Sequence, residues 1–409
     1  MDMKSTLGQK LKNMGPAAII TSAFIGPGTI TTATMAGVSF GYALLWTVVF
    51  SGISLIILME MAARTVIASN MNVIDASIAI FPEKKGWKIL IQAVVFLAVA
   101  AVCFAFQAGN EIGASAGLGD IFGMPQWLAA LIVGTLAMLT AVLGSYKLLE
   151  KIMQIFVSLM GIIFFITMIT VRPSLSGILK GIIPTLPEGS IVSSLALIGT
   201  TLVGINLILH SITCEGRYNK IEDLPDARFD INVNVIIGVV ITMSIIITSS
   251  AVLYGTGTQV NSPLVFSKQL EPVLGSWARI IGNIGLFAAG LSSAIAVPFT
   301  IKSIFSRLFH WEGGGDCIQA KTVGAIVVVF GTVLAMINTK PTQIIVFAQA
   351  TSGFSLPFIA ILLMLVTNNK KIMGEYTNSK PRNIWGAIAV FVTLGLGIWG
   401  LYGALSNFL

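Results

Sequence analysis

Charged residues are scarce in this chain. Asp, Glu, Lys and Arg make up 10% of its 409 residues, against about 25% in ordinary soluble domains. Hydrophobic residues make up 55%, and the mean hydropathy is +0.91. So few charges cannot cover the surface of a soluble domain. The composition therefore predicts an all-α membrane protein that crosses the bilayer many times.

Side chains that bind metals or carry redox chemistry are also scarce. Cys103, Cys214 and Cys317 are too far apart in the sequence to indicate a disulfide framework or a metal cluster. His210 and His310 are too few for a histidine-rich metal site. The sequence shows no nucleophile paired with a base and no phosphate-binding loop. We therefore expect no enzyme activity, no cofactor and no resident metal.

Long polar linkers are absent, so we expect one transmembrane transport domain over residues 1–409. Residues 1–16 are polar and basic and lack a cleavage pattern, which predicts a cytoplasmic arm. Apolar runs of about 20 residues, enough to cross roughly 30 Å of hydrocarbon, follow the arm. They predict eleven spans, at 17–38, 42–66, 87–117, 126–146, 150–171, 190–213, 231–254, 276–306, 322–338, 344–367 and 384–406.

The positive charges indicate the orientation. With the N-terminus inside, all but five of the 24 Lys and Arg residues fall in cytoplasmic segments, as the positive-inside rule requires. The net charge of +7 then reflects topology, and no nucleic-acid partner is expected. We expect a protein of the plasma (inner) membrane, embedded in the lipid bilayer, with its C-terminus outside. The five external residues are Arg172, Lys180, Lys268, Arg279 and Lys340.

Two predicted spans contain helix breakers near their middle. The first contains Gly26, Pro27 and Gly28, and the sixth contains Gly204 shortly before Asn206. Glycine and proline also occur in membrane helices as kinks and close-packing points. Paired interruptions in corresponding places, however, are typical of inverted-repeat transporters, which bind substrate at the midplane between discontinuous helices. The repeats would be 17–171 and 190–367, followed by an eleventh helix at 384–406.

Three stretches carry a family resemblance. They are NMGPAAIITSAFIGPGTITTATMAGVSFGYALLW, TTLVGINLILHS and FAQATSGFSLPFIAILLMLVTNNKKIMGEY. They resemble the first-helix region, the sixth helix, and the tenth helix with its following loop, of the Nramp family of proton-coupled divalent-metal transporters. The resemblance implies a LeuT-type fold with alternating access: two inverted five-helix repeats plus an eleventh helix, with discontinuous first and sixth helices.

The chain departs from this family at the residues that hold the metal. In the family, the ligands are an aspartate and an asparagine of the first helix and a methionine and a carbonyl of the sixth. Here Gly26 and Thr29 stand at the aspartate and asparagine positions, and Val203 stands at the methionine position. The expected substrate-binding residues, including a retained asparagine and glutamine, are Gly26, Pro27, Gly28, Thr29, Thr200, Val203, Gly204, Asn206, Gln349 and Ser355.

The altered residues favour an anionic substrate. Without a carboxylate ligand, the desolvation of a divalent cation is uncompensated. A half-helix N-terminus, in contrast, offers free N–H groups and about half a positive charge to an oxyanion. Thr31 and Thr201 add hydroxyl donors, and the bulky Phe24, Ile25 and Ile205 indicate a small cavity. We therefore expect a small anion, with bicarbonate as the specific hypothesis.

Two other functions remain open. The chain could transport a divalent cation, Mg²⁺ or Mn²⁺, without the usual aspartate and without proton coupling. It could also be a membrane sensor that binds a small ion or solute but transports nothing. Restoring an aspartate at Gly26 distinguishes an anion carrier, which it should harm, from a cation carrier, which it should improve.

Coupling to Na⁺ or H⁺ involves further residues. Ser292 and Ser293 on the eighth helix are expected to face the first helix and to offer hydroxyls to Na⁺, although such serines often only pack helices. The acidic pair that the resemblance links to proton movement aligns with Gln107 and Asn110. The candidate proton-path residues are Gln107, Asn110, Glu111 and His210.

The remaining polar residues of the spans have structural interpretations too. Glu60 and Arg64 are four residues apart, which predicts an ordinary pair on a helix surface. For Glu111, a functional role and simple solvation in an outer vestibule are both open. For His210, a hydrogen-bonded structural role is favoured.

Overall fold

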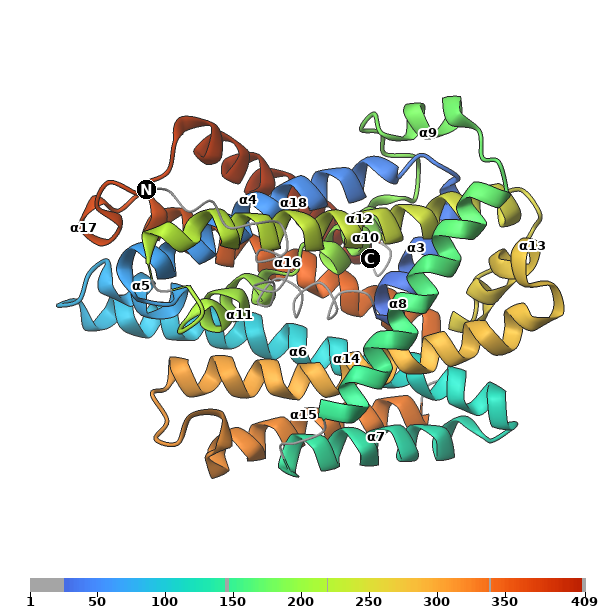
Figure 1. Cartoon of the computed structure of the whole chain (residues 1–409), viewed down its shortest axis with the longest axis horizontal. Coiled ribbons are helices and arrows are strands. Elements are labelled where there is room, and N and C mark those ends of the chain that lie inside the picture. The colour runs from blue at the N-terminus through green and yellow to red at the C-terminus, as the bar shows by residue number, and fades with distance from the viewer. Residues whose placement is uncertain (1–25, 144–146, 219, 338–339, 407–409) are drawn as a thin grey trace.

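The computed structural model describes residues 26–143, 147–218, 220–337 and 340–406. Long helices run roughly along one axis of the molecule, and short helices lie at both ends (Figure 1). The expected cytoplasmic arm, together with Phe24 and Ile25, lies outside the described residues.

Eleven helices or helix pairs correspond to the predicted spans. Within the described residues, nine segments are long and apolar enough to cross a bilayer, with α10 and α11 counted as one. The first and fifth spans are not counted, because α3 begins at the break and the described apolar part of α8 is short. The helices are α3 (Pro27–Phe40), α4 (Leu45–Ser69), α6 (Lys85–Phe122), α7 (Gln126–Leu143), α8 (Lys147–Thr170), α10 (Ile191–Thr201), α11 (Gly204–Cys214), α12 (Leu224–Leu253), α14 (Ala278–Leu308), α15 (Ile318–Ile337), α16 (Pro341–Thr367) and α18 (Lys380–Ser406).

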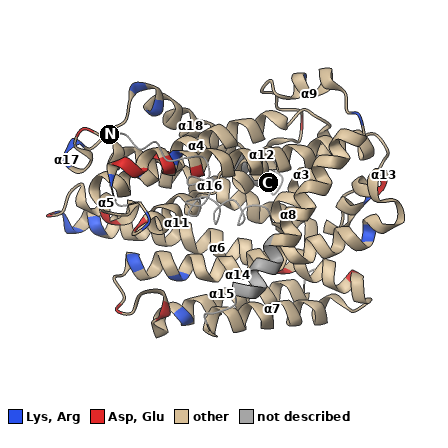
Figure 2. Ribbon diagram, viewed as in Figure 1, with Lys and Arg blue, Asp and Glu red and all other residues tan. Residues whose placement is uncertain are grey.

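Charged residues gather at the two ends of the long helices, whereas the middle is mostly uncharged (Figure 2). Large apolar side chains such as Leu97, Phe347 and Phe391 are exposed on the outer helix faces. An apolar belt between two charged ends is what a bundle in lipid requires. The short helices at the ends are α5 (Val73–Ala79), α9 (Leu175–Gly181), η1 (Ile221–Asp223), η2 (Pro263–Leu270), α13 (Glu271–Leu274), η3 (Gly275–Trp277), η4 (Gly314–Asp316) and α17 (Lys370–Met373).

The described part of the first span begins at a helix N-terminus. Gly26 is the N-cap in an extended conformation (φ −117°, ψ −173°) and has no side chain with which to cap the helix. Pro27 follows at the first helical position, where its missing N–H has no cost. Gly113 of α6 makes room for it, because a Cβ there would lie 2.2 Å from the Pro27 Cβ. The glycine-proline-glycine triplet therefore starts a helix inside the bundle.

The sixth span is discontinuous, as predicted. α10 ends at Thr201, Leu202 leaves the helical region (φ −97°, ψ 74°), and Val203 is extended before α11 begins at Gly204. A Cβ on Gly204 would lie 3.0 Å from the Leu356 Cα of α16. The break is therefore packed against a continuous helix.

A close contact between backbones fixes α16 beside this break. A Cβ on Gly199 of α10 would lie 2.0 Å from the carbonyl oxygen of Gln349 and 2.8 Å from the backbone nitrogen of Gly353. Only glycine permits this approach. The contact brings the predicted binding residue Gln349 close to the end of α10.

Candidate functional site

The two breaks are joined by a pair of buried hydroxyls. The Thr29 and Thr200 Oγ1 atoms lie 2.6 Å apart, and both side chains are buried. Thr29 stands in the first turn of α3, and Thr200 stands in the last turn of α10. The structure therefore brings these two predicted binding residues together, at the meeting point of two helix ends.

Ser293 of α14 faces the start of α3. A Cβ on Gly26 would lie 2.7 Å from the Ser293 Oγ and 3.5 Å from the Asn110 Oδ1. Ser293 is 3% exposed, and its hydroxyl has no hydrogen-bond partner in the described part of the chain. The absence of a side chain at position 26 leaves this hydroxyl directed at the helix N-terminus. Ser292 is only half-buried.

Gln349 contacts the same turn from another side. A Cβ on Gly28 would lie 2.0 Å from the Gln349 Nε2 and 2.9 Å from its Oε1. The buried Gln349 amide thus lies against the α3 backbone. The start of α3 is consequently lined by a hydroxyl from α14 and an amide from α16.

The residues of α11 continue from the break. Val203 and Asn206 are buried, and the Asn206 backbone N–H donates to the Val203 carbonyl at 3.0 Å. His210 follows one turn later, fully buried, with its Nε2 atom 3.7 Å from the Cys214 Sγ. These contacts do not separate a structural role from a proton path, so the role of His210 stays a prediction.

Ser355 contacts none of the other predicted binding residues in the hydrogen bonds of the described chain. It stands six residues after Gln349, about 120° away around α16, and it is buried. Its hydroxyl donates to the Ser352 carbonyl at 2.9 Å. It borders an apolar crevice with Leu97 and Phe358. The Ser355 side chain therefore borders the crevice between α6 and α16, while the next residue, Leu356, contacts Gly204 at the break.

Glu111 is buried, so its interpretation as a solvated residue is wrong. The side chain has no exposed surface, and its Oε1 accepts a hydrogen bond from the Gln107 Nε2 at 2.8 Å. Its Oε2 accepts from the Thr332 hydroxyl of α15 at 2.7 Å. Gln107 also donates to the Ala294 carbonyl at 3.0 Å. Sequence reasoning missed Thr332, because only the fold brings α15 to this face of α6.

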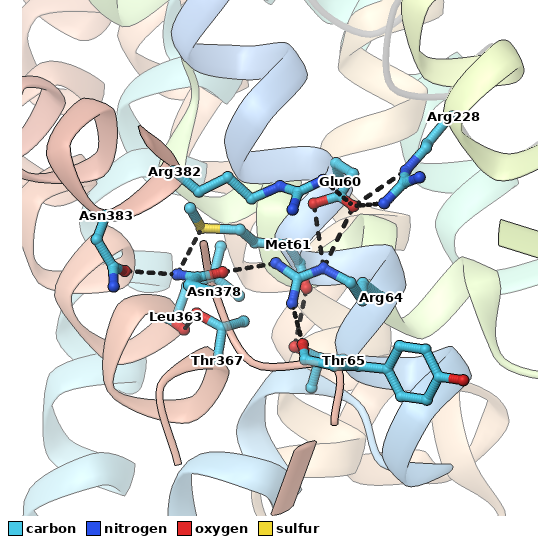
Figure 3. Close-up of polar contacts among 11 residues, drawn as sticks. Glu60, Met61, Arg64, Thr65, Arg228, Leu363, Thr367, Asn378, Arg382 and Asn383 are labelled. Atoms are coloured by element: carbon cyan, nitrogen blue, oxygen red, sulfur yellow. Dashed lines mark hydrogen bonds and ion pairs between the residues drawn. The ribbon is translucent and has the colours of Figure 1, made fainter. Parts of the chain in front are cut away.

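Glu60 and Arg64 are not the ordinary surface pair that their spacing predicts. Both are buried, at 6% and 2% exposed. The Glu60 Oε1 atom lies 3.2 Å from the Arg64 Nε, 2.7 Å from the Arg228 Nη2 of α12 and 3.2 Å from the Arg382 Nη2 of α18 (Figure 3). One carboxylate therefore holds three arginines from three helices.

Backbone and amide groups complete this cluster. Arg64 donates to the carbonyl oxygen of Tyr376. It also donates, at 2.6 Å, to the Asn378 Oδ1 (Figure 3). Both residues lie in the segment between α17 and α18. No sequence signal indicates these contacts, since they join segments more than 300 residues apart. The Glu60 cluster, meaning Glu60 with its three arginines, therefore fixes α4, α12 and α18 together.

The chemistry of the break is neutral. Among the described residues, the polar side chains at the break are hydroxyls and amides, and there is no group of three or more His, Cys, Asp or Glu that could hold a metal ion. Helix ends and unpaired hydroxyls inside a membrane bundle are tolerated where they line a ligand path. Fold and site together define a membrane transporter with discontinuous helices.

The chain belongs to the Nramp family, since the family model described as natural resistance-associated macrophage protein-like matches residues 17–403. A divalent metal cation transporter, MntH, of Yersinia pestis is 26% identical over 403 residues, covering 97% of this chain and 96% of the relative. The MntH of Klebsiella pneumoniae is 27% identical over 411 residues, with 97% and 95% covered. The expected family membership is confirmed, and with it a secondary transporter that is not an enzyme.

Solved structures confirm the LeuT-type fold. A manganese transporter of Eremococcus coleocola, in complex with an aromatic bis-isothiourea compound, is similar with a TM-score of 0.78 at 19% identity, covering 100% of this chain and 90% of that chain. MhsT in complex with L-phenylalanine is similar with a TM-score of 0.59 at 16% identity, covering 93% and 98%.

The comparisons do not support the anion hypothesis. The relatives are named as divalent metal cation transporters, so they favour the alternative of a divalent cation. The described residues at the break, in contrast, lack the carboxylate that such a cation needs. The substrate of this chain is therefore a matter for a proposal.

Proposed function

We propose that this chain moves a small oxyanion, with bicarbonate as the specific candidate, past the start of α3 and the α10–α11 break. The observation that carries the proposal is the Ser293 hydroxyl, which is directed at Gly26, the N-cap of α3, and has no hydrogen-bond partner among the described residues. A planar oxyanion at this point accepts hydrogen bonds from backbone N–H groups and from hydroxyl and amide donors.

The electrostatics of the helix N-terminus also favours a negatively charged substrate. A helix N-terminus carries about half a positive charge and favours an anion by up to about 2 kcal/mol in partly buried geometries. A divalent cation at the same place meets this repulsion and loses several kcal/mol of hydration with no carboxylate to replace it. Neutral donors around Gly26 and Gly28 therefore favour an anion over a dehydrated metal ion.

A divalent cation is the second candidate, because relatives that span almost the whole chain are divalent metal cation transporters. Amide oxygens of Asn206 and Gln349, with the last carbonyls of α10, which lack partners within the helix, would offer ligands to a largely hydrated Mg²⁺ or Mn²⁺. A ligand-binding sensor without transport is the third possibility, and the same experiment tests it.

Coupling and orientation belong to the proposal as well. Ser293 with Ser292 is the candidate site for Na⁺, and Gln107 with Glu111 is the candidate path for H⁺. An inward-moving anion needs such a coupled ion, because the membrane potential opposes it by about 2.3 kcal/mol per charge per 100 mV. The protein would act as a single domain in the plasma membrane, with its N-terminus in the cytoplasm and its C-terminus outside.

Uptake into proteoliposomes tests the substrate. Radiolabelled bicarbonate, Mn²⁺ and Mg²⁺ are offered to the wild type under Na⁺ or pH gradients, and the Gly26→Asp and Gly26→Asn variants are measured beside it. We expect bicarbonate uptake that Gly26→Asp lowers by about tenfold or more, equivalent to about 1.4 kcal/mol. Gly26→Asn, whose side chain has the same shape as aspartate but no charge, should lower bicarbonate uptake less, because only the aspartate repels an anion.

Gly86→Asp is the matched control, since nothing lies within 4 Å of a Cβ at that position. It should leave uptake unchanged. Mn²⁺ or Mg²⁺ flux that increases in Gly26→Asp, without bicarbonate uptake, would contradict the proposal and favour the second candidate. Saturable bicarbonate binding with no flux of any of these ions would favour the sensor.

A further inference from the structure

A cavity of about 690 Å³ lies at the N-terminal end of α16. It is bordered by α3, α10, α16 and the loop before η2. We call it the α16 vestibule. The residues that line it are Met35, Val192, Val260, Asn261, Lys340, Thr342, Gln343, Val346 and Phe347.

The α16 vestibule lies next to the candidate site. Met35 is seven residues beyond Gly28 on α3, or about 10 Å along the helix. Val346 is three residues before Gln349 on α16, or about 5 Å. Gly28 and Gln349 contact each other at the start of α3. The two helices that meet at the site therefore also border this cavity, on the side assigned to the outside.

The charge that lines the vestibule is positive. Among the described residues that line it, Lys340 is the charged one, and the others are apolar or carry neutral amides and hydroxyls. Lys340 is also the N-cap residue of α16, with Pro341 in the first turn. The first N–H groups of a helix have no partner within the helix and carry a partial positive charge. A lysine and a helix N-terminus therefore face the same space.

A buried hydroxyl at the same place points to a ligand. Thr342 is 4% exposed, and its Oγ1 has no hydrogen-bond partner in the described part of the chain. Buried hydroxyls are normally hydrogen-bonded, so an orphaned one needs an explanation. A ligand oxygen in the vestibule would provide the missing partner.

We propose that the α16 vestibule is an anion-capture site, in which Lys340, the Thr342 hydroxyl and the first free N–H groups of α16 hold a small oxyanion before it moves on to Gly26. The inference rests on the proposed function, because it names where the same substrate is first bound. A cationic, partly enclosed site raises the local concentration of an anion and its rate of entry.

Transport kinetics test the capture step. Lys340→Gln and Thr342→Val are compared with Lys268→Gln, which removes one exposed charge from the same side of the protein without lining the vestibule. We expect Lys340→Gln to raise the KM for bicarbonate by about threefold or more with an unchanged maximal rate. Thr342→Val should also raise the KM, whereas Lys268→Gln should not. The effect of Lys340→Gln should shrink at high ionic strength, because salt screens exposed charges.

A second measurement does not depend on transport. Gln343→Cys places a thiol on the exposed lining of the vestibule, where it is treated from outside with methanethiosulfonates that carry a sulfonate or a trimethylammonium group. Adding Lys340→Gln should lower the ratio of the sulfonate rate to the ammonium rate. Bicarbonate should slow the sulfonate reagent while Lys340 is present.

The two measurements separate the two ideas. If the wild-type protein takes up no bicarbonate, the proposed function is contradicted, but the thiol-labelling test of the vestibule still applies. An unchanged rate ratio and no protection by bicarbonate overturn the anion-capture site. An unchanged KM in both Lys340→Gln and Thr342→Val, with bicarbonate uptake intact, overturns it as well.

Discussion

At the residue scale, two glycines decide which groups reach the start of α3. Gly26 leaves room for the Ser293 hydroxyl, and Gly28 leaves room for the Gln349 amide. The sequence analysis assigns Gly26, Gly28 and Gln349 to substrate binding and Ser293 to a coupling ion, and these roles stay predictions. It could not predict that they meet, since three helices, far apart in sequence, contribute them.

The Glu60 cluster shows the limit of local reasoning at the same scale. A spacing of four residues correctly pairs Glu60 with Arg64, but it says nothing about burial. Arg228 and Arg382 come from helices that only the fold brings near. A pair that would contribute little on a surface is therefore part of a buried network.

We expect Glu60→Gln to lower the free energy of unfolding by about 3 kcal/mol, because it leaves the buried Arg64 charge uncompensated. Arg382→Gln is the control, since the Arg382 side chain is 32% exposed and its loss should cost less than about 1 kcal/mol. Thermal unfolding of both variants in detergent measures the difference. Equal, small shifts would show that the cluster is not a stabilising centre.

At the element scale, the sequence of the sixth span predicts the break between α10 and α11. It does not predict how that break packs against α16. Gly204 and its register with the first break predicted the interruption between α10 and α11. Gly199 gave no comparable signal, because its role depends on the backbone of α16 about 150 residues later. Close backbone packing becomes visible only when both helices are in place.

Gly199→Ala should be strongly destabilising. Its methyl group would lie 2.0 Å from a backbone oxygen of α16, and a backbone cannot rotate away as a side chain can. We expect a loss of about 3 kcal/mol, since overpacking of a rigid contact is costly. Gly86→Ala, with open space around it, should have little effect. The yield of monodisperse protein and its melting temperature compare the two, and similar behaviour of both variants would refute the close contact.

At the scale of the whole molecule, apolar length alone predicted where the helices lie. The eleven predicted spans all correspond to helices or parts of helices in the described residues. The LeuT-type fold needed the family resemblance in addition, because helix count does not fix topology. The orientation in the membrane rests on the distribution of Lys and Arg, which is an argument from charge rather than from packing.

Cysteine labelling tests this orientation. Cys317 is half-buried in a segment assigned to the cytoplasm, whereas Cys103 and Cys214 are buried. In intact cells, a membrane-impermeant maleimide should react with the Lys268→Cys variant but not with the wild type. Wild-type labelling should appear only after permeabilisation. Reaction of Cys317 from outside would reverse the topology.

The neutral groups around Gly26 also bear on poisoning by heavy metals. Soft ions such as Cd²⁺ are held by thiolates, thioethers and imidazoles, and none of these side chains is among the nearest neighbours of Gly26 and Gly28 in the described residues. A carrier with such a site offers a soft toxic metal ion none of the ligands that it prefers. On the proposed function, we therefore expect this protein to carry no Cd²⁺ across the membrane.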